Sequence, residues 1–82
     1  CMKTVISVQP LSNYRLLLEF DNGEKRIGDI SPLLAKPVFT FLKDTVFFNA
    51  VYIECGAVTW KDQNGNEVDI CPDKLYMDSV PA

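Results

Sequence analysis

The sequence predicts an α+β fold with two antiparallel three-stranded β-meander units, linked by short helices and followed by a short C-terminal helical turn. Three observations support this prediction: short runs of alternating apolar residues, an Asn-Gly pair in each half of the chain, and a proline after the strand that follows each pair. Asn-Gly between alternating runs is typical of a tight hairpin, and proline suits the first position of a helix. The order turn, strand, proline occurs twice, from Asn22-Gly23 to Pro32 and from Asn64-Gly65 to Pro72.

The first meander is expected to begin with two strands. Residues 4–8 are rich in β-branched side chains, which favours a strand. Residues 14–20 follow an alternating pattern, which favours a second strand with one apolar face. The residues on that face are Tyr14, Leu16, Leu18 and Phe20.

A two-residue type I′ turn at residues 22–23 would join the second strand to the third. This turn length places Leu18 opposite Ile27 and Glu19 opposite Arg26. The first pair is apolar and the second is oppositely charged, so both faces of the hairpin agree with the turn.

Short helices are expected between the two meanders. Ser31 is predicted to cap a helix that starts at Pro32. Residues 39–42 and 44–49 are predicted to form one or two further helical pieces, with Asp44 as an N-cap. The positions with helical spacing that we expect to pack inward are Phe39, Leu42 and Val46.

The second meander is expected to have strands at residues 51–54, 57–61 and 67–70, with a turn at 55–56 and a closing helical turn at 72–77. A two-residue loop in its last hairpin would pair Trp60 with Asp69, which mixes the two faces. A three-residue loop at 63–65 pairs Trp60 with Val68 instead, so we prefer it. The buried face would then consist of Val51, Ile53, Val58, Trp60, Val68 and Ile70.

The chain has 82 residues, 48% of them hydrophobic, and is expected to form a single small α+β domain over residues 2–82. Cys1 precedes Met2, which resembles a natural start, so we expect Cys1 to be an addition ahead of it. A domain of this size cannot hide all its apolar surface, so a homo-oligomer or a protein partner is expected.

The charge pattern argues against direct nucleic-acid binding. The net charge is −3, and the 8 Lys and Arg residues are adjacent only at Lys25-Arg26, so no basic stripe exists. The apolar runs are too short to cross a membrane. With 3 Cys and no C-x-x-C motif, we expect a cytoplasmic protein in which Cys55 and Cys71 are free thiols.

No catalytic, cofactor-binding or metal-binding residue is predicted. A cysteine or serine nucleophile needs an activating base, and the chain contains no histidine. Residues 62–66 resemble the first ligands of a calcium loop, but Glu67 stands where that loop needs glycine and Asp73 where it needs glutamate. We therefore expect that the chain is not an enzyme.

Two carboxylates are candidates for a ligand site or for a structural role. Asp29 and Asp69 end equivalent strands in the two meanders. If they met in space, they could share a proton and form a weak acid–base or small-molecule site. Alternatively, each carboxylate accepts hydrogen bonds at the start of a helix, where the helix dipole favours a negative group.

An aromatic group is the candidate protein interface. Phe47 and Phe48 cannot both face the core from one helix, because neighbouring positions are turned about 100° apart. The ring left exposed, beside Tyr52, would suit contact with another protein. The candidate interface residues are therefore Phe47, Phe48 and Tyr52.

Several segments, in their order along the chain, resemble the bacterial family called domain of unknown function 2442. These segments are residues 14–24 (YRLLLEFDNGE), 29–34 (DISPLL), 42–44 (LKD) with Phe48, 60–70 from Trp60 to Ile70, and 72–76 (PDKLY). Together they cover nearly the whole chain. The order of the segments carries the resemblance rather than any one of them.

The resemblance implies a compact α+β fold similar to the N-terminal domain of a Nitrosomonas member, in which a helix-turn-helix segment follows. Family members are often small bacterial proteins whose genes lie beside another small protein, which suggests a toxin–antitoxin-like pair. The resemblance supplies no catalytic residues. This chain carries extra residues 61–63 in its last hairpin and ends at Ala82 without a DNA-binding extension, so direct DNA contact is not expected.

We therefore expect a non-enzymatic protein-interaction domain that self-associates or binds a small partner protein. Two alternatives stay open: a small-molecule or weak acid–base site near Asp29 and Asp69, and a transcription-associated regulator that acts through a DNA-binding partner. A hollow that contains both carboxylates would favour the first alternative. An exposed aromatic patch would favour the interaction domain.

Overall fold

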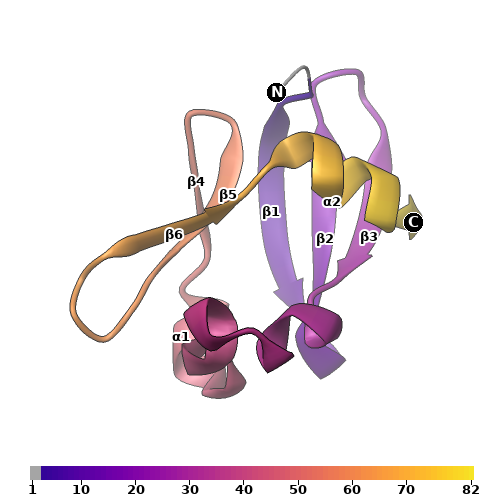
Figure 1. Ribbon diagram of the computed structural model, residues 1–82. Coiled ribbons are helices and arrows are strands. Elements are labelled where there is room, and N and C mark those ends of the chain that lie inside the picture. The colour runs from indigo at the N-terminus through magenta and orange to yellow at the C-terminus, as the bar shows by residue number, and fades with distance from the viewer. Residues whose placement is uncertain (1–2) are drawn as a thin grey trace.

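The computed structural model describes residues 3–82 (Figure 1), so the expectation about Cys1 lies outside the described residues. The strands are β1 (Val5–Leu11), β2 (Arg15–Phe20), β3 (Lys25–Asp29), β4 (Tyr52–Glu54), β5 (Ala57–Lys61), β6 (Glu67–Ile70) and β7 (Val80–Pro81). The 3-10 helices are η1 (Ser12–Tyr14), η2 (Ser31–Ala35) and η3 (Pro37–Lys43), and the α-helices are α1 (Thr45–Asn49) and α2 (Pro72–Asp78).

The strands form two antiparallel sheets, with the orders β1-β2-β3-β7 and β4-β5-β6. This arrangement confirms the predicted α+β fold with two meanders, linked by short helices and closed by a helical turn. The sequence missed β7, which adds to the edge of β3 through Arg26 and Ile27. A strand of two residues is too short to show alternation.

The first hairpin differs from its prediction. Leu18 pairs with Arg26 and Glu19 pairs with Lys25, so the predicted pairs Leu18–Ile27 and Glu19–Arg26 are wrong. The loop holds three residues, because the Gly23 amide donates to the Phe20 carbonyl at 2.9 Å and only Gly23, at φ 87°, has positive φ in this turn. The Asn-Gly pair therefore marks the turn, and the loop length shifts the register by one residue.

Helix α2 explains why this register is stable. It lies across the face of the sheet that carries Phe20 (Figure 1), and the Tyr76 ring meets the Phe20 ring edge-on with centroids 5.2 Å apart. The Arg26 guanidinium lies 4.4 Å from the centre of the Tyr76 ring, and its Nε donates to Ser79 Oγ at 2.6 Å. The Arg26 guanidinium therefore lies on the inner face of the sheet, where its partners come from α2 and the residue after it, which are distant in the sequence.

The second hairpin has the predicted register. Trp60 pairs with Val68 and Val58 pairs with Ile70, which confirms the three-residue loop. Gly65 has φ 80° and its amide donates to the Asp62 carbonyl at 2.9 Å, so both hairpins use the same kind of loop.

One hydrophobic cluster spans both sheets. Its centre is Trp60, which is fully buried and donates from its indole Nε1 to the Phe48 carbonyl at 3.1 Å. The buried apolar residues are Val5, Leu16, Leu18, Phe20, Ile30, Leu34, Phe39, Leu42, Phe48, Val58, Trp60, Ile70 and Leu75. Most of the predicted apolar positions belong to this cluster or pack against it, but Val46 is 75% exposed and that prediction is wrong.

The helix starts are mostly as predicted. Asp44 caps α1, because its Oδ1 accepts from the Val46 amide at 3.0 Å. Pro32 lies at the start of η2, but Ser31 is not its cap. Instead, Asp29 Oδ1 accepts from the amide of Ser31 at 2.9 Å and from its hydroxyl at 2.7 Å. Ser31 is the first residue of η2 and its hydroxyl donates to Asp29 instead of accepting from the helix, so the prediction for Ser31 is wrong.

The cysteines differ from one another. Cys55 is an exposed free thiol, as predicted. Cys71 is disulfide-bonded, so the prediction of a free thiol is wrong there. Cys71 lines the same hollow as Lys3 and Thr4, which places the N-terminal part of the chain beside it. The prediction of a free thiol rested on the expected reducing cytoplasm. Nothing in the sequence indicated that Cys71 lies beside Lys3 and Thr4.

Glu24 connects the first hairpin to α2 and makes stability depend on pH. Its carboxylate accepts from the Tyr76 hydroxyl at 2.7 Å and lies 3.3 Å from Arg26 Nη1. The bond from Tyr76, helped by Asn22 and Arg26, lowers the pKa of Glu24 below its usual 4.5. A carboxylate with a lowered pKa stabilises the fold above its unfolded pKa, and that contribution is lost as pH falls through the folded pKa.

We expect Glu24→Gln to flatten the acid limb of the stability curve. The wild type should lose stability as pH falls from about 5 to about 3, and the variant should lose less because its amide does not titrate. Urea denaturation at a series of pH values measures the difference. Identical pH dependence in the two proteins would contradict this assignment.

Candidate functional site

Phe48 does not belong to an exposed surface. Its side chain is 2% exposed and packs between two rings, edge-on to Tyr14 at 5.5 Å and stacked on Trp60 at 6.3 Å between centroids. Helix α1 has one face toward β5, and neighbouring positions cannot share that face. The core takes Phe48, so Phe48 is removed from the candidate interface and Phe47 remains.

Phe47 is half-buried and belongs to an apolar surface formed by the two helices η3 and α1. Its ring meets the Phe41 ring edge-on at 5.8 Å. Val46, next to it, is 75% exposed, and Val38 is 53% exposed. Val38 and Phe41 are three positions apart in a 3-10 helix, which places them above one another on one side. We call Val38, Phe41, Val46 and Phe47 the η3–α1 surface.

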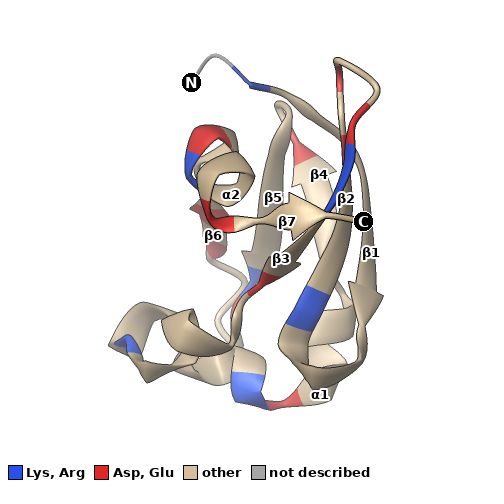
Figure 2. Ribbon diagram, turned by 90° about the vertical axis from the view of Figure 1, so that its right-hand side faces the viewer, with Lys and Arg blue, Asp and Glu red and all other residues tan. Residues whose placement is uncertain are grey.

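Lys43 borders the η3–α1 surface. It ends η3, and within residues 3–82 it makes no ion pair. Figure 2 shows Lys and Arg positions, in blue, along the segment between β3 and α1. The Tyr14 hydroxyl donates to the Lys43 carbonyl at 2.6 Å and ties the end of η3 to the first sheet. The surface therefore combines apolar side chains with free positive charge.

Tyr52 makes its contacts within the second sheet. It sits in β4, where alternation puts it on the opposite face from Ile53, and its hydroxyl donates to Glu67 Oε2 at 2.8 Å. That bond raises the pKa of Tyr52 to about 12. Glu54 and Glu67 share a hydrogen bond, which raises the pKa of Glu54 and lowers that of Glu67. The sequence analysis missed this group, although strand alternation puts Tyr52 and Glu54 on one face.

Asp29 and Asp69 do not form a joint site. Asp29 ends β3 in the first sheet, and its bonds from Ser31 lower its pKa. Asp69 lies in β6 of the second sheet, opposite Thr59. The two carboxylates line separate hollows, so the geometry gives no support to an acid–base pair at these residues.

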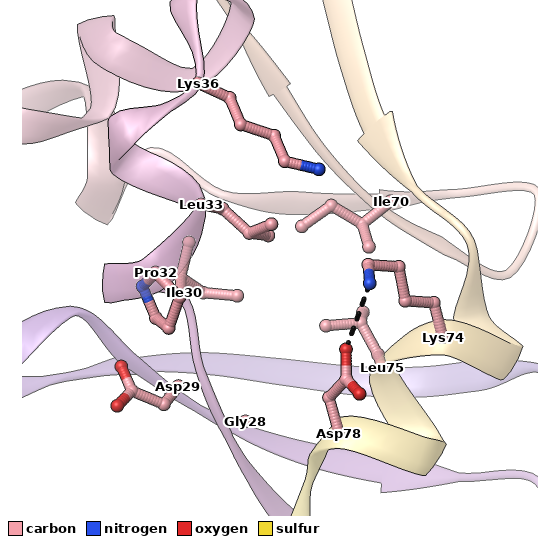
Figure 3. Close-up of a pocket in the computed structure, with 10 residues that line it drawn as sticks. All are labelled: Gly28, Asp29, Ile30, Pro32, Leu33, Lys36, Ile70, Lys74, Leu75 and Asp78. Atoms are coloured by element: carbon pink, nitrogen blue, oxygen red, sulfur yellow. Dashed lines mark ion pairs between the residues drawn. The ribbon is translucent and has the colours of Figure 1, made fainter.

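Asp29 does line a cleft between η2 and α2. The cleft has a volume of about 430 Å³ and an apolar floor that includes Ile30, Leu33, Ile70 and Leu75. Figure 3 shows Lys36 on one side and Lys74 on the other, with Lys74 paired to Asp78 at 3.2 Å. The Asp29 carboxylate is turned away from Leu75 and Asp78 (Figure 3) and accepts hydrogen bonds from Ser31, so it does not pair with Asp78 for acid–base chemistry.

The four-stranded sheet has a second face that no helix of residues 3–82 covers. In Figure 2, α2 lies on one side of this sheet and the other side is open. Leu17 pairs with Ile27, and Ile27 pairs with Val80, so these three apolar side chains form a row across the open face. Leu17 and Ile27 are half-buried and Val80 is 59% exposed. We call this the open sheet face.

Between Lys3 and Ala82, no group of three or more His, Cys, Asp or Glu side chains is placed to hold a metal ion. None of the helices described has the length and apolar character that a membrane crossing requires.

Comparison with known proteins identifies the family. The family model described as "Protein of unknown function (DUF2442)" matches residues 5–81, nearly the whole chain. No curated protein and no solved structure matches the chain.

Proposed function

We propose that this chain, which belongs to the DUF2442 family of proteins of unknown function, is a non-enzymatic domain that binds a partner protein through the η3–α1 surface. The observation that carries the proposal is the 75% exposure of Val46, which is next in sequence to Phe47, whose ring meets the Phe41 ring edge-on. Apolar side chains gathered on the surface of a small domain mark contact sites. Lys43, which makes no ion pair within residues 3–82, borders this surface.

The chemistry of the surface defines the partner. An apolar centre excludes water and supplies binding energy, and charges at its rim select and steer the partner. Lys43 attracts carboxylates, so the partner presents apolar side chains bordered by Asp or Glu. The resemblance to small bacterial proteins with neighbouring genes supports a small partner protein in a bacterial cytoplasm.

Val46→Glu tests this proposal without disturbing the core, because the side chain is largely exposed. A photo-crosslinking residue at position 46 identifies the partner in the native host, and the purified partner is then titrated by calorimetry. We expect Val46→Glu to weaken binding about tenfold or more, since a buried carboxylate would face the partner's apolar centre. Lys43→Glu should weaken binding several-fold at low salt and less at high salt.

The matched control is Val80→Glu, which introduces the same charge at an exposed valine of β7, outside the η3–α1 surface. It should leave partner binding unchanged. Equal loss in Val46→Glu and Val80→Glu, or full affinity in both Val46→Glu and Lys43→Glu, would overturn the proposal.

A further inference from the structure

We propose that the open sheet face binds the open sheet face of a second copy of this chain, forming a two-fold symmetric dimer. This surface is separate from the η3–α1 surface, so the inference does not depend on the proposed function. Its basis is the pattern of charge around the apolar row, read from the strand register.

The row is bounded by charges on both sides. Two residues after Leu17, on the same face of the sheet, Glu19 pairs with Lys25. Two residues before Leu17, Arg15 pairs with Asp29. Alternate residues of a strand share a face, so all four charges lie on the open sheet face. The charge of Arg15 also contributes to the lowered pKa of Asp29, which agrees with this placement.

The four charges alternate in sign around the row, and this makes the face complementary to itself. A two-fold axis parallel to the row places each strand over the same strand of the second copy and reverses its direction. Arg15 then meets Glu19 of the partner subunit, and Lys25 meets Asp29 of the partner subunit. Symmetry repeats each contact, which gives four ion pairs of opposite sign around one apolar centre.

A second two-fold axis, parallel to the strands, would also pair opposite charges, and the residues at the two ends of the row disfavour it. Gln9 pairs with Leu17 and extends the row at the β1 edge, while Val80 ends it at the other edge. An axis along the row sets valine on valine and glutamine on glutamine. An axis along the strands would set Val80 on Gln9, which buries an amide against an apolar group at a cost in free energy.

The contact is of a common kind. Sheets pack face to face about 10 Å apart, and the inner side chains interdigitate between them. The apolar row supplies the binding energy, and the surrounding charges fix the orientation of the two copies. A domain of 82 residues also gains from covering apolar area that its own core cannot hide.

Sedimentation equilibrium over a range of concentrations tests the dimer. We expect the wild type to dimerise, and Ile27→Glu and Val80→Glu each to raise the dissociation constant about 30-fold or more. Val80 is exposed, so its variant keeps the fold even if Ile27→Glu does not. Val46→Glu is the matched control and should dimerise like the wild type.

A charge exchange tests the orientation. Arg15→Glu alone and Glu19→Arg alone should each dimerise more weakly, because each places like charges opposite one another. An equimolar mixture of the two should form a heterodimer, because every contact again joins opposite charges. A wild type that stays monomeric, a dimer lost in Val46→Glu but kept in Val80→Glu, or a mixture that associates no better than the single variants would overturn the proposal.

Discussion

Replacing Trp60 by alanine is expected to lower the free energy of unfolding by about 3–5 kcal/mol, the range for deleting a large core aromatic side chain. Trp60 is fully buried at the centre of the cluster that spans both sheets. Its ring stacks on Phe48 at 6.3 Å between centroids, and its indole donates to the Phe48 carbonyl. The substitution therefore leaves a cavity and removes the donor from a buried carbonyl.

Urea denaturation followed by far-UV circular dichroism measures this loss. Trp60→Phe is the matched variant, because it keeps most of the ring and removes the indole donor. We expect it to fall between the wild type and Trp60→Ala. A loss of less than about 1 kcal/mol in Trp60→Ala would contradict the packing described here.

Phe20→Ala is expected to have a similar effect, about 3–5 kcal/mol, through the other sheet. Phe20 is fully buried at the end of β2, opposite Val5. Its ring supports the Tyr76 ring, which in turn carries the contacts of Glu24 and Arg26 with α2. Removing the Phe20 ring therefore loosens α2 as well as the sheet.

The single Trp of the chain turns Phe20→Ala into a test of cooperativity. Trp60 lies in the second sheet and Phe20 in the first, but both belong to one hydrophobic cluster. We expect the fluorescence of Trp60 and the far-UV signal to shift together to the same lower midpoint. Phe20→Leu should shift both less. A Trp60 transition that stays at the wild-type midpoint would show that the two sheets unfold independently.

Local patterns were sufficient for much of this fold. The Asn-Gly pairs located both hairpins, and Pro32 and Pro72 located two helix starts. The register of the last hairpin followed from the sequence, because Trp60 and Val68 are apolar and Asp69 is not, so only one loop length keeps the faces apart. Asp44 was identifiable as a cap because capping is a contact between residues two or three positions apart.

The first hairpin and the interface depended on contacts between distant segments. The sequence favoured the register that pairs Leu18 with Ile27. The observed register is stable because the Tyr76 ring and the Ser79 hydroxyl contact Arg26 on the inner face. Likewise, only the packing of α1 decided that Phe48, rather than Phe47, lies in the core.

The open sheet face shows most clearly which features follow from the sequence pattern and which depend on the tertiary structure. Alternation in the sequence determined that β2 would have two faces, with Leu16 and Leu18 on one and Leu17 on the other. Only the tertiary structure decided that α2 covers the first face and that β7 extends the second with Val80. The physical reason is that a periodic pattern specifies which side chains lie together, whereas burial depends on which distant segment packs against them, and that is set by the free energy of the whole chain.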